Sequence, residues 1–240
     1  MHPDRDARER LVFALDLDDP EEALACARSL AGALTWIKVA TRLYTRAGAP
    51  LIQSLQDLGF KVFLDLKFHD IPDQVEGACR AASGLGVGLL TVHAAGGRAM
   101  LEAAARGAAE GGDAKVLAVT VLTSLDGRDL TDIGVQRSVD EQVLALARLT
   151  RDAGCAGVVA SPRELPLLRP ALPSPFGILT PGIRPRGAAV GDQKRVTTPA
   201  EAIAGGSDWL VVGRPIRNAP DRVAAATAIL DEMAGALGSA

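Results

Sequence analysis

Short apolar segments recur along the chain, and each is almost continuously hydrophobic rather than alternating with polar residues. Eight of them are predicted to be strands, at residues 11–15, 36–40, 61–66, 89–94, 115–122, 157–160, 176–179 and 209–213. Uninterrupted apolar runs of this length are typical of parallel strands that are covered on both faces.

The segments between these runs carry helix signals. Residues 18–32 begin with acidic residues and a proline and end in a glycine, as helix ends prefer. Residues 138–141 and 198–201 have the Ser/Thr-x-x-Glu spacing of a capping box, and residues 222–237 predict an alanine-rich helix. Strands and helices therefore alternate along the chain.

This alternation predicts a single-domain (β/α)₈ TIM barrel over residues 1–240, with residues 1–10 as a polar N-terminal tail. The length suits such a barrel, which typically has about 250 residues. An open, doubly wound sheet is the alternative architecture. The one long segment without periodicity, residues 180–199, follows the seventh strand and is expected to be a lid or binding loop, with a disordered surface insertion as the alternative.

Composition narrows the function classes. The chain is 48% hydrophobic and 23% charged, with a net charge of −3 and scattered basic residues, which argues against a general nucleic-acid-binding surface. We expect no membrane span, because no apolar run reaches the roughly 18 residues that one needs. Cys26, Cys79 and Cys155 show no metal-binding spacing and are expected to be free thiols. With no signal peptide at residues 1–10, these features predict a cytoplasmic protein.

The stretch FLDLKFHDIPD at residues 63–73 combines strand character with ionisable groups. Side chains two apart on a strand share a face, so Asp65 and Lys67 point the same way as Phe63, while Leu64 and Leu66 point toward the helices. Ionised groups beside apolar surface are costly unless they are paired. If the strand ends near Lys67, both charges lie at the C-terminal mouth of the barrel, where barrel active sites are built.

Further charges fall at matching positions of neighbouring strands. Asp16 ends the first strand, Lys38 lies within the second, and Asp70 follows the third. Two acids and two lysines are therefore expected to converge on one mouth, with Asp70 nearby. A purely structural ion-pair network, or solvated charges at strand ends, would give the same pattern.

The last two strands predict a phosphate site. Barrels often bind phosphate with the loops that follow strands seven and eight. Gly213 would let the backbone approach a ligand, Arg214 supplies guanidinium donors, and the loop after strand seven contributes Arg184 and Gln193. A surface ion pair is the alternative role for Arg214.

The two histidines near the mouth are expected to be structural. His93 ends the fourth strand and His69 lies beside Lys67. Neither belongs to a Ser-His-Asp or HExxH pattern.

Taken together, these motifs resemble the orotidine 5′-monophosphate decarboxylase family. DLKFHDIP is similar to that family's DxKxxD segment. Similar motifs follow the order and spacing of the bacterial branch along nearly the whole chain: ALD at 14–16, IKV at 37–39, TVHAAGG at 91–97, TVLTS at 120–124, PGIRP at 181–185, GDQKR at 191–195 and VVGRPI at 211–216.

The resemblance implies a homodimer that converts orotidine 5′-monophosphate to uridine 5′-monophosphate (UMP) and CO₂ without metal or organic cofactor. It implies a catalytic set of Lys38, Asp65, Lys67 and Asp70, in which Lys67 protonates C6 of the pyrimidine and Asp70 and Ile71 serve the neighbouring subunit's site. Substrate contacts are implied for Asp16, Lys38, Asp65, Ile71, Gln74, Thr123, Arg184, Gln193, Gly213 and Arg214.

Two positions depart from the family pattern. Gln74 stands where relatives often have a threonine that contacts the ribose, and Ala40 stands where glycine is common. We expect these changes to alter affinity rather than abolish the chemistry.

Two other functions remain open on the residues alone. The first is a magnesium-dependent sugar-phosphate decarboxylase or aldolase of the same superfamily, but such relatives are expected to carry an acid at the position of Lys38. The second is a catalytically inactive phosphate-binding protein, which would have no need for the closely spaced charges of Asp65, Lys67 and Asp70.

Overall fold

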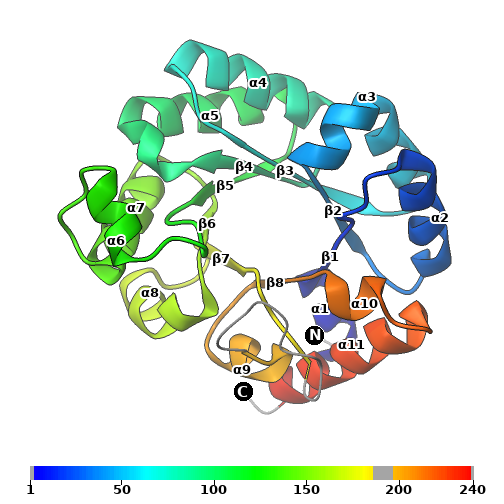
Figure 1. The fold of residues 1–240 in the computed structure, drawn as a ribbon. Coiled ribbons are helices and arrows are strands. Elements are labelled where there is room, and N and C mark those ends of the chain that lie inside the picture. The colour runs from blue at the N-terminus through cyan, green and yellow to red at the C-terminus, as the bar shows by residue number, and fades with distance from the viewer. Residues whose placement is uncertain (1–2, 186–196, 239–240) are drawn as a thin grey trace.

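Eight parallel strands form a closed barrel in the computed structural model, which describes residues 3–185 and 197–238. Each strand pairs with the next and β8 pairs with β1, while the helices lie outside the ring (Figure 1). The strands are β1 (Leu11–Ala14), β2 (Trp36–Ala40), β3 (Lys61–Phe68), β4 (Leu89–His93), β5 (Lys115–Val119), β6 (Gly157–Val159), β7 (Gly177–Thr180) and β8 (Trp209–Val212). The predicted TIM barrel is therefore confirmed.

Helices fill most of the connections between strands. They are α1 (Pro3–Arg10), α2 (Pro20–Leu30), α3 (Thr41–Asp57), α4 (Pro72–Gly84), α5 (Gly97–Gly111), α6 (Gly127–Asp132), α7 (Val139–Asp152), α8 (Leu165–Ala171), α9 (Pro199–Ala204), α10 (Arg214–Arg217) and α11 (Arg222–Leu237), with the 3₁₀ turns η1 (Ala94–Gly96) and η2 (Pro162–Glu164). The capping boxes predicted before α7 and α9 are both formed. No helix among the described residues is long and apolar enough to cross a membrane.

The strands separate two hydrophobic cores. The inner core fills the barrel and includes Val12, Phe63 and Leu117, while the outer core lies between strands and helices and includes Leu64. Phe63 and Leu64 therefore point to opposite sides of β3, as the two-residue period predicts. The interior of the barrel is therefore a packed core rather than a pore, and ligands of such barrels bind at the mouth.

The end of β3 is irregular. The strand runs to Phe68, two residues beyond the predicted boundary, and its pairing with β4 shifts register between Leu64 and Phe68. Lys67 has a φ of 54°, and among the described residues it is the one non-glycine with positive φ. This bulge changes the direction of the chain where the charged side chains begin.

The N-terminal segment is not the polar tail that its composition predicts. Residues Pro3–Arg10 form α1, which packs against α11 and contacts β2 and β8. Ala7 is fully buried in the outer core, and the carboxylate of Glu9 pairs with the Lys61 ammonium of β3 at 2.7 Å.

Candidate active site

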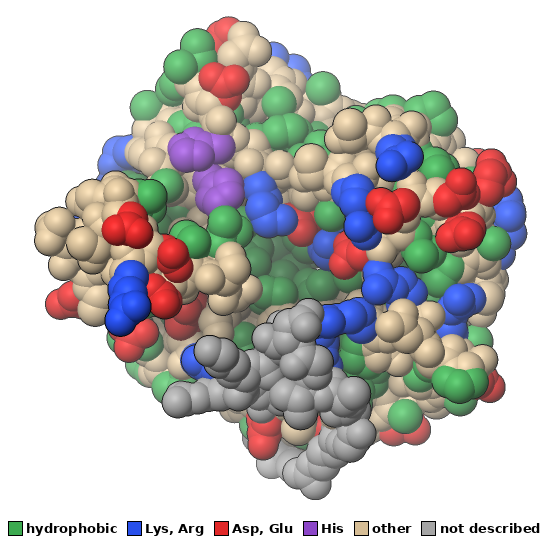
Figure 2. Space-filling view, in the orientation of Figure 1, with side chains coloured by type: hydrophobic (Ala, Val, Ile, Leu, Met, Phe, Trp, Pro, Cys, Tyr) green, Lys and Arg blue, Asp and Glu red, His purple; other side chains and the backbone are tan. Residues whose placement is uncertain are grey.

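A cavity of about 340 Å³ opens at the C-terminal ends of the strands. Figure 2 shows the hollow with an apolar floor and with basic and acidic side chains around its rim. Phe63, Val119 and Leu179 belong to the apolar lining. The ionisable groups come from β2 and β3 and from the segments that follow β1, β7 and β8. The site therefore combines a hydrophobic base with charged walls.

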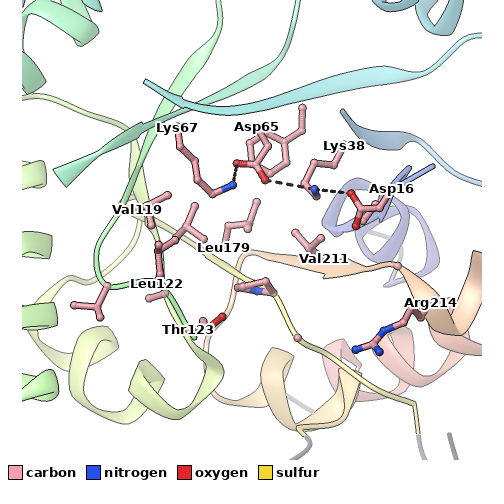
Figure 3. Close-up of a pocket in the computed structure, with 18 of the residues that line it drawn as sticks. Asp16, Lys38, Asp65, Lys67, Val119, Leu122, Thr123, Leu179, Val211 and Arg214 are labelled. Atoms are coloured by element: carbon pink, nitrogen blue, oxygen red, sulfur yellow. Dashed lines mark hydrogen bonds and ion pairs between the residues drawn. The ribbon is translucent and has the colours of Figure 1, made fainter. Parts of the chain in front are cut away.

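Four alternating charges form a row along one wall (Figure 3). The ammonium Nζ of Lys38 lies 3.3 Å from Oδ1 of Asp16 and 3.4 Å from Oδ2 of Asp65. Nζ of Lys67 lies 2.7 Å from Oδ1 of Asp65. The convergence predicted for Asp16, Lys38, Asp65 and Lys67 is thus present within this chain.

Burial makes this row electrostatically strong. Lys38 and Asp65 are only 8% and 7% exposed, respectively. Burial alone would raise the pKa of Asp65, but the ammonium groups of Lys38 and Lys67 outweigh it and hold that pKa below its usual value. Asp65 is therefore an ionised carboxylate that shields two neighbouring positive charges from each other.

Neighbouring residues hold the row in place. Thr91 on β4 donates its hydroxyl proton to Oδ1 of Asp65 at 2.9 Å and accepts the backbone N–H of Lys67 at 3.0 Å. The carbonyl oxygen of Asp16 accepts hydrogen bonds from the guanidinium groups of Arg42 and Arg217. These supporting residues were not predicted from the sequence. For Thr91, the available signal was a polar residue in the middle of an apolar strand.

Of the residues expected to bind phosphate, Arg184, Gly213 and Arg214 line the cavity. Arg214 lies across the pocket from Lys67 (Figure 3), and Thr123, which is expected to contact the pyrimidine, is also part of the lining. A Cβ added at Gly213 would come within 3.3 Å of the Ala14 side chain, so glycine permits the close approach of β8 to β1. An anionic group bound near Arg214 would therefore lie on the other side of the cavity from the Lys67 ammonium.

Three predicted site residues do not line this cavity. Asp70 accepts the backbone N–H of Ile71 at 2.7 Å, and Ile71 is 63% exposed. Gln74 lies exposed in the first turn of α4.

Two further positions singled out in the sequence have other outcomes. Gln193, predicted as a phosphate ligand, lies outside the described residues. Ala40 has an extended backbone, with φ −100° and ψ 172°, so this position does not require the glycine common in relatives.

The two ends of the predicted binding loop lie together. Ile183 and Thr197 form an isolated bridge, and the backbone N–H of Arg184 donates to the Thr197 carbonyl at 3.1 Å. Arg184 is only 6% exposed, so it is fixed at the base of this segment and beside the cavity.

The rings of the two histidines pack against each other in a tilted arrangement beside the charged row. The ring centroids of His69 and His93 are 5.5 Å apart. Burial, His69 and Lys67 lower the pKa of His93, which keeps this imidazole neutral near pH 7. Neither ring lines the cavity, in agreement with a structural role.

The donor set favours an anionic organic ligand. Within residues 3–185 and 197–238, no group of three or more His, Cys, Asp or Glu side chains is arranged to hold a metal ion. The space between the carboxylates of Asp16 and Asp65 contains the Lys38 ammonium. The site can thus hold an anion at one end and place a lysine proton near an apolar surface at the other.

Comparisons with known proteins agree with this arrangement. Residues 9–229 match the model of the "Orotidine 5'-phosphate decarboxylase / HUMPS family". The chain is 51% identical to an orotidine 5'-phosphate decarboxylase of Halorhodospira halophila over 228 residues, which cover 95% of this chain and 97% of that protein. It is 49% identical to the corresponding protein of Dichelobacter nodosus, over 92% of this chain and 96% of the relative.

Solved structures show the same architecture. The crystal structure of orotidine 5'-phosphate decarboxylase from Lactobacillus acidophilus superposes with a TM-score of 0.86 at 37% identity, covering 94% of this chain and 99% of the other. The enzyme from Pyrococcus horikoshii OT3 gives a TM-score of 0.75 at 28% identity, with 93% and 98% covered. The likeness therefore extends over the whole barrel rather than over the motifs alone.

Proposed function

This chain belongs to the orotidine 5′-phosphate decarboxylase / HUMPS family, and we propose that it converts orotidine 5′-monophosphate to UMP and CO₂ in pyrimidine biosynthesis. It is a carboxy-lyase, as its relatives are. The observation that carries the specific reaction is the row of Asp16, Lys38, Asp65 and Lys67, in the same cavity as two arginines that can hold a phosphate.

The chemistry demands a preorganised charge. Breaking the C6–carboxylate bond leaves its electron pair on C6 of the pyrimidine, where no neighbouring group can delocalise it. Enzymes lower such barriers by about 8–23 kcal/mol, and fixed charges usually supply the largest share. The ammonium of Lys67, held 2.7 Å from Asp65, offers a positive charge for that electron pair.

Lys67 also completes the reaction. Its ammonium transfers one proton to C6, which forms the C–H bond of UMP and leaves the lysine neutral until solvent reprotonates it. Asp65 holds the Lys67 ammonium in place for this step through their ion pair of 2.7 Å. Asp65 also repels a substrate carboxylate placed beside it, and this repulsion is relieved once neutral CO₂ departs.

The phosphate end supplies binding energy far from the reacting carbon. Arg214 borders the cavity across from Lys67, and Arg184 also lines it. We assign the 5′-phosphate to these two arginines, with Gln193 as a further ligand. Thr123 is assigned to the pyrimidine and Asp16 with Lys38 to the ribose. Binding energy from the remote phosphate can be used to orient the reacting carbon against Lys67.

Two residues are assigned to a second subunit. Asp70 and Ile71 lie outside the cavity of their own chain, and Ile71 is a largely exposed hydrophobic residue next to the mouth. A homodimer in which these residues complete the neighbour's site accounts for both facts. We place the activity in the cytoplasm, where the three buried cysteines would remain reduced.

The position of Lys38 distinguishes this function from a magnesium-dependent reaction on a sugar phosphate. A divalent cation would need the carboxylates of Asp16 and Asp65, and the Lys38 ammonium already lies between them. The proposed mechanism therefore uses the lysines where such relatives would use a metal.

The deciding experiment mixes the purified protein with orotidine 5′-monophosphate in EDTA and follows the formation of UMP and CO₂. We expect metal-independent turnover that Lys67→Ala abolishes. Lys61→Ala is the matched control, because Lys61 lies at the opposite end of β3 and pairs with Glu9. Turnover only with added Mg²⁺, or ligand binding without turnover, would refute the proposal.

A further inference from the structure

The backbone at Lys67 is held in an unfavourable conformation. Its φ of 54° lies in the left-handed region, where a side chain with a Cβ is disfavoured. The register shift between Leu64 and Phe68 also removes Lys67 from the regular ladder between β3 and β4. Some other group must therefore fix this residue.

The hydroxyl of Thr91 is that group. It accepts the backbone N–H of Lys67 at 3.0 Å and donates its single proton to Oδ1 of Asp65 at 2.9 Å. A hydroxyl has one proton, and Asp65 is ionised, so the direction of both hydrogen bonds is determined. Thr91 is fully buried on β4, and its branched side chain has few rotamers.

We infer that Thr91 is a positioning residue for decarboxylation: it locks the carboxylate of Asp65 and the backbone of Lys67 so that the Lys67 ammonium points into the cavity. This inference rests on the proposed function. Thr91 does not line the cavity, so it acts through its two partners rather than on the substrate.

The geometry shows why this role is specific. Oδ1 of Asp65 accepts both Nζ of Lys67 and the hydroxyl of Thr91, so the hydroxyl fixes the oxygen that orients the ammonium. Without the hydroxyl, the backbone N–H of Lys67 loses its hydrogen-bond acceptor. The left-handed conformation of Lys67 then loses the hydrogen bond that stabilises it. The ammonium would then move relative to the reacting carbon, and small displacements of a catalytic group reduce rates strongly.

Valine and serine separate the hydroxyl from the shape of the side chain. Thr91→Val keeps the shape and removes both hydrogen bonds, whereas Thr91→Ser keeps the hydroxyl. Thr150→Val is the matched control, because Thr150 is also fully buried but donates to the Leu146 carbonyl within α7. Thr91→Ala is a second hydroxyl-free variant in case valine prevents folding.

Steady-state kinetics should separate the variants. We expect Thr91→Val to lower kcat at least tenfold with less than a threefold change in KM, and Thr91→Ser to remain within threefold of wild type in kcat. The acid limb of the kcat/KM profile should move to higher pH in Thr91→Val, because the Thr91 hydrogen bond helps to lower the pKa of Asp65. Thr150→Val should match wild type. A Thr91→Val enzyme with wild-type kcat and pH profile would overturn the inference.

A second measurement does not depend on turnover. In the substrate-free protein, NMR should show faster hydrogen exchange at the Lys67 amide and a raised carboxyl pKa for Asp65 in Thr91→Val but not in Thr91→Ser. If wild type fails to decarboxylate orotidine 5′-monophosphate, the proposed function is wrong, while these two signals still test the positioning. Unchanged exchange and titration in Thr91→Val would refute the positioning itself.

Discussion

At the scale of single residues, Glu164 couples the stability of the fold to pH. It is 8% exposed at the end of η2, where its Oε2 accepts the backbone N–H of Ser161 at 2.8 Å. Burial raises the pKa of Glu164 from 4.5 to about 7, and Asp140 adds to the increase, while the Ser161 hydrogen bond and Arg163 oppose it. The folded state therefore binds this proton more tightly than the unfolded state does.

The sign of the effect follows from linkage. As pH rises from about 4.5 to 7, the unfolded chain has lost the proton that the folded chain keeps, so Glu164 lowers the free energy of unfolding across this window. At about 1.4 kcal/mol per pKa unit, the loss approaches ~3 kcal/mol above pH 7. We expect Glu164→Gln to be more stable than wild type at pH 8 and to lose this slope, as measured by urea unfolding at pH 5 and 8.

Glu141 provides the control for this prediction. It occupies the same capping-box position, three residues after Ser138, but it is exposed and its pKa is lowered by its hydrogen bonds to Ser138. Glu141→Gln should therefore give no gain in stability at pH 8. An equal response of the two variants would show that the cap, rather than burial, sets the pH dependence.

Residue types and spacing were enough to predict the charged row. Asp16, Lys38, Asp65 and Lys67 converge because they lie within or just after the neighbouring parallel strands β1 to β3, whose C-terminal ends meet at one mouth. The role of Thr91 could not be predicted, because its contacts depend on a register shift and a positive φ that no periodicity encodes.

At the scale of elements, two glycines of α5 set how closely it packs on α4. A Cβ added at Gly107 would lie 2.2 Å from the carbonyl oxygen of Glu76, and one at Gly111 would lie 2.1 Å from that of Arg80. Both contacts involve helix backbone, which cannot yield as a flexible side chain can. The two helices therefore lie nearly in backbone contact.

We expect Gly107→Ala to push these helices apart and to destabilise the fold. Overpacking of this kind costs about 1–3 kcal/mol, and each kcal/mol lowers Tm by roughly 2–4 °C in a chain of this size. Gly77→Ala on α4 is the control, because nothing lies within 4 Å of its added Cβ. That substitution should raise stability by about 0.5–1 kcal/mol through helix propensity. Thermal unfolding of both variants tests the prediction, which fails if both raise Tm.

Element boundaries were predicted less well than element types. All eight strands were found from continuous apolar runs, but the predicted strand at residues 115–122 ends at Val119. The strand predicted to end at residue 66 continues to Phe68 through the bulge. Apolar character continues past a strand where the chain still lines a core, so hydrophobicity alone cannot mark where the ladder stops.

At the scale of the whole molecule, Asp70 lies outside the cavity that the closed barrel forms. The closed ring brings Asp16, Lys38, Asp65 and Lys67 together. Among the described hydrogen bonds, Asp70 accepts only the backbone N–H of Ile71, the next residue in its own chain. One chain therefore forms the fold and most of the candidate site, while the role proposed for Asp70 requires a second chain. Complementation between inactive variants can test this division directly.

We expect Lys67→Ala and Asp70→Ala homodimers to be nearly inactive, and a mixed dimer of the two to recover activity. In the mixed dimer, one site has both defects, while the other combines Lys67 of one chain with Asp70 of its partner. The purified mixed dimer, isolated through two different affinity tags, should therefore show about half the wild-type turnover per dimer, because each closed two-fold dimer has two equivalent sites.

The reciprocal dimer makes the result decisive. A wild-type chain paired with a chain that carries both Lys67→Ala and Asp70→Ala should be inactive if Asp70 acts across the interface, because each site then lacks one group. If Asp70 serves its own chain instead, this reciprocal dimer keeps one intact site and the first mixed dimer has none. The dimer that is active in one model is therefore the inactive one in the other model. Isolation of monomers alone would also contradict a shared site, since Asp70 does not line the cavity of its own chain.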